Sequence, residues 1–204
     1  MDTQPQAPSD SLPVEFVPFK KIPRLCRECV ISEKIDGTNA QLVIPEDPTQ
    51  PVLVGSRNRW ITPGKSTDNF AFAQFVATNE VALRRLGPGR HFGEWYGVGI
   101  GRGYGLSERR WALFNTGKAL PEGLPSNVEQ VPVLFDGPMH WEMGSDPFQD
   151  AVWTMKNKGS VAVRGYMNPE GVVLYHKAAG VYFKYTLDGD AVHAPKHPSP
   201  IEHP

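Results

Sequence analysis

The sequence has little cysteine, no long apolar run and almost no net charge. Only 2 of the 204 residues are cysteine, too few for a disulfide scaffold, so we expect a protein of the reducing cytoplasm. No run reaches the roughly 20 apolar residues of a membrane span, and the polar, proline-containing start is unlike a signal peptide, so no membrane partner is expected. The net charge of -1 excludes a protein that is basic overall and binds nucleic acid by its total charge.

Glycine and proline, by contrast, are abundant, with 20 residues of each. This content predicts many turns without reaching the composition of a disordered chain. Residues 1–13 and 188–204 show no apolar period, so we expect the first to be a flexible arm and the second a flexible tail. Residues 14–187 show neither an internal repeat nor a linker and are expected to form a single domain.

Positive and negative side chains are separated along the chain. Cations outnumber acids in residues 20–34, 84–110 and 156–184, whereas residues 121–150 hold six acids and neither lysine nor arginine. A fold that brings the three basic segments together would have a local anion-binding surface despite the near-zero total. On charge alone, ordinary solvated side chains are the simpler interpretation.

Short strand-like runs dominate the predicted domain. They are residues 29–34, 40–44, 52–56, 91–96, 111–115, 131–135, 160–163, 172–176 and 181–186. Two helices are predicted, over about 68–86 with Asp68 at the start, and over about 147–158 between Asp146 and Gly159. Many short strands without a regular βαβ alternation favour an α+β fold with antiparallel sheets.

Two familiar glycine patterns are too incomplete to carry a function. Gly64-Lys65-Ser66 resembles the end of a P-loop, but the position five residues earlier is Arg59 instead of glycine, so a polar loop is expected. Glycines alternate through residues 97–105 without a helical pattern to follow. This favours a loop beside a site, in which Arg102 could meet a phosphate.

One segment places a lysine, a potential nucleophile, at the end of a predicted strand. Lys34 follows an apolar strand-like run and comes just before the turn Asp36-Gly37. A lysine at such a position is expected to be partly desolvated, and desolvation together with neighbouring cations lowers a lysine's pKa and exposes its lone pair. The alternative is a plain hairpin turn with a surface lysine.

The segment Lys34-Ile35-Asp36-Gly37-Thr38-Asn39 resembles motif I of the covalent nucleotidyltransferases, the superfamily of ATP-dependent DNA and RNA ligases and mRNA capping enzymes. Its Thr-Asn ending is more similar to the RNA ligase 2-type branch and its phage relatives. Further resemblances follow in the family's order: Ser56-Arg57-Asn58-Arg59 to motif Ia, Phe92-Gly93-Glu94-Trp95 to motif III, Ala112-Leu113-Phe114-Asn115 to motif IIIa, Glu170-Gly171-Val172-Val173 to motif IV and Phe183-Lys184-Tyr185-Thr186 to motif V. Each match is weak alone, but the ordered set spans nearly the whole predicted domain.

The resemblance implies an α+β, ATP-grasp-like nucleotidyltransferase domain of antiparallel sheets flanked by a few helices, acting as an ATP-dependent RNA ligase. In this family the motif I lysine, here Lys34, attacks the α-phosphate of ATP, releases pyrophosphate and keeps AMP as a phosphoramidate. The adenylate then passes to the 5′-phosphate of a nucleic acid, here expected to be RNA. A 3′-hydroxyl finally displaces AMP and seals the strands.

The same resemblance implies roles for the other motif residues. The nucleotide-binding residues would be Glu33, Ile35, Asn39, Arg57, Glu94, Phe114, Glu170 and Lys184. Phe114 would stack on adenine, although a core aromatic is an equally good interpretation of an apolar strand. Mg²⁺ or Mn²⁺ would be held by Asp36, Glu94 and Glu170 directly or through water, because such ions prefer oxygen ligands.

Two departures from the family pattern matter. Motif V often carries a second lysine two residues from the first, but tyrosine and threonine stand at those positions around Lys184, so Lys177 is a candidate substitute. The chain has 18 residues after Thr186, too few for the OB or helical domain of larger relatives, so we expect a minimal, monomeric enzyme of the phage or bacterial type. The candidate substrate or phosphate contacts in place of such a domain are Lys20, Lys21, Arg24 and Arg102.

Other functions share parts of this pattern. A minimal DNA nick ligase, or an enzyme that stops after adenylating a 5′ end, would use the same chemistry. A non-catalytic module that binds nucleic-acid ends would share only the fold, and the presence of Lys34, Glu94 and Glu170 argues against it. An adenylyltransferase acting on protein also fits these residues.

Overall fold

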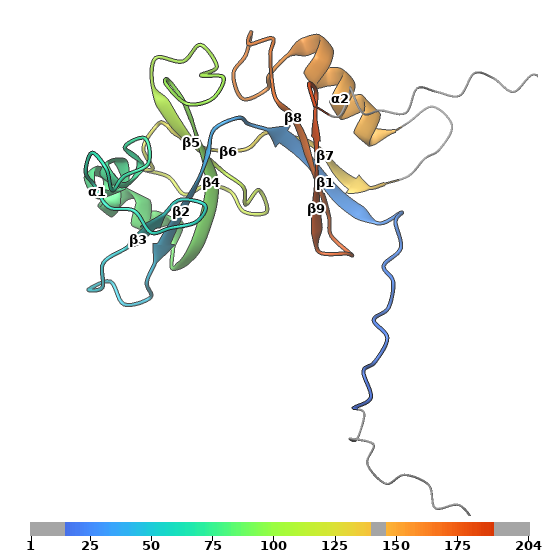
Figure 1. Ribbon diagram of the computed structural model, residues 1–204, viewed down its shortest axis with the longest axis horizontal. Helices are drawn as coiled ribbons and strands as arrows, with labels where there is room; N and C mark the ends of the chain where they lie inside the picture. Colours follow the sequence, from blue (N-terminus) through green and yellow to red (C-terminus); the bar gives the residue numbers. More distant parts are fainter. Residues whose placement is uncertain (1–14, 140–145, 190–204) are drawn as a thin grey trace, which may run out of the picture.

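The chain forms two sheets, each with a helix on one side (Figure 1). The structure is a computed structural model and describes residues 15–139 and 146–189. In this part, one sheet has four strands in the order β7-β1-β8-β9, and the other has five in the order β3-β2-β4-β5-β6. Neighbouring strands are antiparallel except β5 and β6. This is the predicted α+β fold with antiparallel sheets.

The strands are β1 (Glu28–Lys34), β2 (Thr38–Ile44), β3 (Leu53–Gly55), β4 (Gly89–Gly97), β5 (Arg109–Leu113), β6 (Val128–Gln130), β7 (Val133–Pro138), β8 (Gly171–His176) and β9 (Val181–Thr186). The helices are α1 (Phe72–Leu83), followed by the 3-10 turn η1 (Arg84–Leu86), and α2 (Pro147–Lys158). Within the described residues no helix is long and apolar enough to cross a membrane.

Each sheet buries one face against a helix, because successive strand residues point to opposite faces. In β1, Cys29 and Ile31 are fully buried and belong to the core formed with α2. In the larger sheet, Trp95 and Trp111 pack against Phe72 of α1, with ring centroids 5.3 and 5.2 Å from the phenylalanine ring. The other face of the larger sheet carries polar and exposed side chains, together with Tyr96 and Ala112, which are buried in a smaller core.

Both predicted helices are present; Asp146 is the N-cap of α2 as predicted, whereas the N-cap of α1 is Ala71 instead of Asp68. Asp146 accepts hydrogen bonds from two amides in the first turn of α2, and Gly159, with φ of 78°, ends the helix. α1 begins four residues after Asp68, later than predicted. The Asp68 carboxylate still accepts from the N–H groups of Ala73 and Gln74, at 2.8 and 2.9 Å.

One predicted strand is wrong. Residues 160–163 form no strand, and residues 161–163 are bends, because their N–H groups do not bond to a neighbouring strand. Those of Val161 and Ala162 donate to the Glu33 carboxylate, and that of Val163 donates to the Ser160 hydroxyl. The strand predicted at 131–135 begins two residues later and continues to residue 138, and the sequence patterns do not predict β6.

The two sheets are joined by the connection from β1 to β2, which crosses between them (Figure 1). Ile35 of this connection is buried in a small core with Tyr96 and Tyr104. A Cβ at Gly37 would lie 2.5 Å from the carbonyl oxygen of Trp95, so only glycine lets the connection pass this close to β4. Lys34 is thereby held where the two sheets meet.

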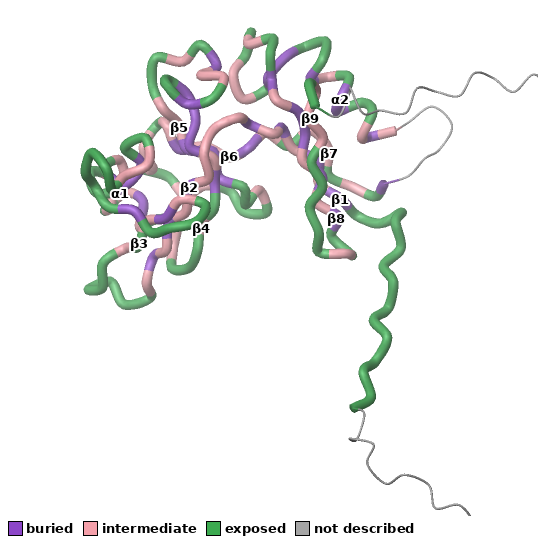
Figure 2. The backbone as a smooth tube through the Cα atoms, in the orientation of Figure 1, coloured by how far each residue is buried: buried purple, intermediate pink, exposed green. Residues whose placement is uncertain are grey.

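The described chain begins with an extended segment, residues 15–27, that is exposed throughout and leads away from the sheets (Figures 1 and 2). The predicted arm at 1–13 lies outside the described residues, as does all but the beginning of the predicted tail at 188–204.

Candidate active site

Lys34 lies at the end of β1, opposite the start of β8. The register pairs Lys34 with Gly171, so Glu170, just before β8, reaches the lysine. The Lys34 Nζ lies 2.6 Å from Glu170 Oε1, and the two side chains are 23% and 19% exposed. Partial exclusion of water strengthens the attraction between the two charges. The strand end therefore presents an amine directly to a carboxylate.

A second group of polar side chains comes from the larger sheet. Asn39 of β2 and Glu94 of β4 are opposite each other in the register, and Asn39 Nδ2 donates to Glu94 Oε2 at 3.0 Å. The exposed Arg57 donates from Nε to Asn39 Oδ1 at 2.9 Å. The structure thus brings three of the predicted nucleotide-binding residues into one chain of hydrogen bonds.

Burial raises the pKa of Glu94 to about 7. Desolvation of the carboxylate is the largest cause, and the negative charges of Glu170 and Asp36 add to it. The charge of Lys34 and the hydrogen bond from Asn39 act in the opposite direction. Glu94 therefore changes its charge near neutral pH, and its interaction with Lys34 and Glu170 shows that both sheets contribute to one site.

The carboxylates at this site fit a hard divalent cation in part. Glu170 Oε2 is buried and has no hydrogen-bond partner, and such an oxygen suits a metal ion or a metal-bound water. Asp36, Glu94 and Glu170 do not form a ready set of ligands, since no three acidic, histidine or cysteine side chains of the described residues converge on one point. The donor set fits an ion that keeps several water or phosphate ligands.

Asp36 is held by the glycine-rich loop between β4 and β5. Its N–H donates to the Tyr104 hydroxyl at 2.9 Å, and its Oδ2 accepts from the backbone N–H of Arg102 at 3.0 Å. The Arg102 guanidinium lies 3.5 Å from the same oxygen and pairs with Asp188 at 2.6 Å. The loop therefore does lie beside Lys34, but the guanidinium that was predicted to meet a phosphate is already held by two carboxylates.

Glu33 points away from Lys34, as its neighbour in a strand must. Its side chain is buried and accepts hydrogen bonds from the Ser160 hydroxyl at 2.6 Å and from the N–H groups of Val161 and Ala162 at 2.8 and 2.9 Å. These three hydrogen bonds hold the Glu33 carboxylate inside the protein. This geometry favours an anchoring role for the side chain over the predicted contact with the nucleotide.

Ile35 and Phe114 lie in contrasting environments. The Ile35 side chain is buried between the sheets, so only the backbone of this residue can contact a nucleotide. Phe114 follows β5 and is 44% exposed, with its N–H donating to the Phe92 carbonyl oxygen at 2.9 Å. Phe114 is therefore not a core aromatic, and its ring is open to stacking.

The motif V lysine, Lys184, and its candidate substitute, Lys177, lie apart in the smaller sheet. Lys184 of β9 is exposed, and the register across β8 places it on the same face as Lys34. Lys177 follows the far end of β8, where its Nζ pairs with Asp136 at 2.6 Å. The structure therefore does not bring Lys177 to Lys34 as a substitute for a second lysine.

The predicted basic residues before β1 also lie away from this site. Lys20, Lys21 and Arg24 are exposed on the extended segment that enters β1 at the end opposite Lys34 (Figure 1). A phosphate contact by these residues would need a substrate that extends along the protein.

Sequence motifs do not reveal two residues that support the site. Tyr104 holds the backbone of Asp36, and Ser160 holds the carboxylate of Glu33. Neither belongs to a recognised motif. The signals available were the place of Tyr104 among alternating glycines and that of Ser160 just after the glycine that ends α2.

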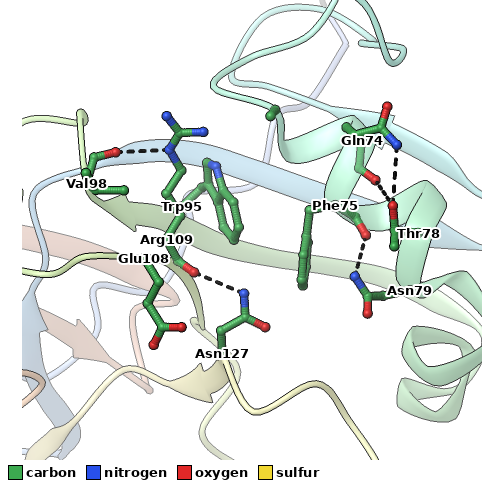
Figure 3. Close-up of a pocket in the computed structure, with 10 residues that line it drawn as sticks. Gln74, Phe75, Thr78, Asn79, Trp95, Val98, Glu108, Arg109 and Asn127 are labelled. Carbon is green, nitrogen blue, oxygen red and sulfur yellow. Dashed lines mark hydrogen bonds between the residues drawn. The ribbon is translucent and has the colours of Figure 1, made fainter.

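A separate hollow of about 510 Å³ lies on the other side of the larger sheet, beside α1 (Figure 3). Phe75 and Trp95 stack in it with ring centroids 5.0 Å apart, and Asn127 Nδ2 donates to the Arg109 carbonyl oxygen. Trp95 follows Glu94 in β4 and points to the opposite face. The hollow is therefore distinct from the site at Lys34.

Residues 27–186 match the family of RNA ligases. This range contains all the motifs and nearly all the packed part of the chain. The chain therefore belongs to the RNA ligase family. No curated protein sequence matches the chain.

Solved structures of an RNA ligase from Naegleria gruberi share the fold. A mutant of RNA ligase R4a without ligand is 19% identical, with a TM-score of 0.53, and the match covers 82% of this chain and 52% of that one. A mutant with ATP and Mn is 18% identical, with a TM-score of 0.52 and the same coverage. The ligase with PPi is 19% identical, with a TM-score of 0.51, covering 82% and 51%. This chain thus spans about half the length of the structures it matches.

Proposed function

We propose that this chain is an ATP-dependent RNA ligase with Lys34 as its nucleophile. The observation that carries the proposal is the position of Lys34, whose Nζ lies 2.6 Å from Glu170 Oε1 at the junction of the sheets. Membership of the RNA ligase family supports it. The similarity in fold to Naegleria gruberi RNA ligase mutants with ATP and Mn supports it further.

In the first step Lys34 attacks the α-phosphate of ATP. An ammonium group has no lone pair, so a proton first leaves Nζ, and Glu170 Oε1 is in place to accept it. The N–P bond forms as the bond between the α-phosphorus and the bridging oxygen breaks, and pyrophosphate leaves with that electron pair. AMP remains on Lys34 as a phosphoramidate.

The larger sheet supplies the groups that hold the nucleotide. The exposed ring of Phe114 stacks on adenine, a contact that needs no hydrogen bond. The hydrogen-bonded pair of Asn39 and Glu94 offers acceptors to the ribose hydroxyls. Arg57 uses Nε for Asn39 and keeps its other N–H groups for the phosphates, and the exposed Lys184 adds a second cation.

A Mg²⁺ or Mn²⁺ ion, when bound, neutralises phosphate charge and assists the departure of pyrophosphate. Glu170, through its unpartnered Oε2, and Glu94 are the residues that would hold it, directly or through water. Asp36 is less suited, because its carboxylate already accepts from Arg102.

The later steps seal the RNA. The 5′-phosphate attacks the phosphorus of lysyl-AMP, so that a P–O bond forms, the N–P bond breaks and the Lys34 amine is released. The 3′-hydroxyl then attacks the activated 5′-phosphate, and AMP leaves as the phosphodiester forms. Glu94, whose pKa burial raises to about 7, can take up or release a proton beside these steps at neutral pH. We expect a monomer to suffice.

Labelling of the protein with ATP tests the first step. Incubation with α-labelled ATP and Mg²⁺ or Mn²⁺, followed by denaturing electrophoresis, should leave acid-labile label on wild type. Lys34→Ala should carry none, because the attacking amine is gone. Lys156→Ala, which changes an exposed lysine on α2, is the matched control and should label like wild type. Unlabelled wild type, or equal label on Lys34→Ala, would contradict the covalent mechanism.

A panel of RNA and DNA substrates with different ends distinguishes the related activities. Wild type should seal nicked or single-stranded RNA with 5′-phosphate and 3′-hydroxyl ends, and labelled GTP should not replace ATP. Sealing of nicked DNA alone would indicate a DNA ligase. Accumulation of the adenylated 5′ end would indicate an enzyme that stops at the second step, and binding of ends without labelling would indicate a non-catalytic module.

A further inference from the structure

Three exposed aromatic residues lie on or beside the helix-free face of the larger sheet. Trp60 is 52% exposed, Phe92 50% and Phe114 44%. Phe114 has a predicted role at the adenine of ATP, whereas Trp60 and Phe92 have none. Large aromatic rings that are half exposed to water cost free energy in the unliganded protein. A cluster of such rings is therefore typical of a surface that binds a ligand.

An arginine links the two unassigned rings. The Arg90 guanidinium carbon lies 5.6 Å from the centroid of the Trp60 ring and 5.8 Å from that of Phe92, within the range of a cation–π contact. Arg90 also donates a hydrogen bond to the side-chain oxygen of Gln41 on the neighbouring strand. Trp60, Arg90 and Phe92 therefore form one fixed surface, which we call the Trp60–Phe92 platform.

The platform continues the surface of the candidate active site. Glu94, Phe92 and Arg90 alternate along β4, so their side chains share one face. Phe114 lies beside Phe92 on the adjacent strand, since its N–H donates to the Phe92 carbonyl oxygen. Trp60 joins from the segment after β3, where it forms a bridge with Gly55. A ligand can thus run from Lys34 over Glu94 and Phe114 to the platform.

The chemistry of the platform fits a nucleobase. The acidic side chains of this face, Glu94 and Glu129, lie in the row of Asn39. The next residues of β2 and β3 on this face are Gln41, Val43, Leu53 and Gly55, so the part of these strands beside the platform carries no negative charge to repel a phosphate. Flat aromatic and guanidinium surfaces stack on any base, and the guanidinium attracts the phosphate beside it.

We propose that the Trp60–Phe92 platform binds a nucleobase of the RNA strand to be sealed, beyond the nucleotide that reacts with Lys34. The proposal rests on the proposed function for the identity of the strand. It adds a contact that recognises bases without selecting among them. By holding one base on the same face of the larger sheet as Glu94 and Phe114, the contact would also orient the end of the RNA strand relative to Lys34.

Binding of two matched RNA probes tests the platform. The first probe is a labelled single-stranded RNA of mixed sequence with a 3′-hydroxyl, and the second has the same backbone with abasic residues. We expect Trp60→Ala to bind the first probe about tenfold more weakly than wild type in fluorescence anisotropy. The abasic probe should bind both proteins equally, because it offers phosphates but no ring to stack.

Trp153→Ala is the matched control. Trp153 is 55% exposed on α2 and has its own cation, with Lys158 Nζ 5.5 Å from the ring centroid, but it lies on the other sheet's helix. It should bind both probes like wild type. Unchanged binding of mixed-sequence RNA by Trp60→Ala, or an equal loss for the abasic probe, would overturn the proposal.

Lysine labelling separates this inference from the proposed function. Trp60-dependent RNA binding by a wild-type protein that takes up no label would support the platform and contradict the ligase. Labelling that is lost in Trp60→Ala as strongly as RNA affinity would overturn the platform, because the ring would then serve ATP. Normal labelling with a selective loss of RNA affinity supports both.

Discussion

Four successive residues at the end of β1 have four different environments. Glu33 is bonded inside the protein, Lys34 meets Glu170, Ile35 packs between the sheets and Asp36 is held by the glycine-rich loop. The alternation of strand residues separates the first two, so a carboxylate can anchor the strand while the neighbouring amine stays available. A single motif therefore combines the proposed nucleophile with residues that fix its position.

Glu94 leads to a prediction about stability and pH. Its pKa is raised from 4.5 to about 7 in the folded chain, so between these pH values the folded state holds more protons than the unfolded state. The stabilisation from this extra proton is full below pH 4.5 and is lost as the pH rises through 7. Glu94→Gln, which stays neutral, should therefore gain stability relative to wild type between about pH 5 and pH 8, by up to about 3 kcal/mol.

Urea unfolding of the ATP-free proteins at the two pH values measures this gain. Glu122→Gln, at an exposed glutamate, serves as the control and should keep a nearly constant difference from wild type. A constant difference for Glu94→Gln as well would show that Glu94 titrates in the folded chain as it does in the unfolded one.

At the scale of elements, local hydrogen bonds separate the correct predictions from the wrong one. α2 has its cap and its stop at the predicted residues because Asp146 bonds to amides two and three residues away. The segment 160–163 has apolar residues typical of a strand, but its N–H groups bond to Glu33, more than a hundred residues earlier. A pattern in the local sequence cannot predict a hydrogen-bond partner that is so far away along the chain.

The glycine-rich loop offers a test of how Asp36 is held. A Cβ at Gly101 would lie 2.7 Å from the Asp36 carboxylate, whereas one at Gly105 would meet nothing within 4 Å, and both residues have positive φ, 49° and 66°. Gly101→Ala and Gly105→Ala should share a backbone cost of about 1 kcal/mol. Gly101→Ala should lose about 1–2 kcal/mol more, because the carboxylate must leave its partners.

Denaturant unfolding and lysine labelling of the two variants check this expectation. The additional loss in Gly101→Ala should be accompanied by slower labelling, since Asp36 is two residues from Lys34. Equal stability of the two variants would mean that the contact between the loop and Asp36 contributes nothing.

At the scale of the whole molecule, the candidate site is divided between the sheets. The smaller sheet brings Lys34 and Glu170, and the larger brings Asn39 and Glu94. The three basic segments of the sequence do not all meet there. Residues 84–110 and 156–184 contribute Arg102 and Lys184, but the cations before Lys34 in the first segment stay on the exposed extension.

That extension gives a prediction about the substrate. Reversing Lys20, Lys21 and Arg24 to glutamate should weaken RNA sealing by about tenfold and lysine labelling much less, because a long RNA can reach the extension and ATP cannot. Reversing Lys156, Lys158 and Arg164, which are also exposed, changes the total charge equally and is the control. Equal losses of sealing and labelling in the first variant would exclude this division of labour.

The sequence by itself determined the order of the motifs, the nucleophile candidate, the caps of α2 and most strands, because these depend on residue type and short spacing. Only the tertiary structure decided which carboxylate meets Lys34, that Glu33 is anchored by the loop after α2, and that Lys177 is far away. Strand register and the junction of two sheets set those distances. They bring together residues more than a hundred positions apart, which no local pattern can specify.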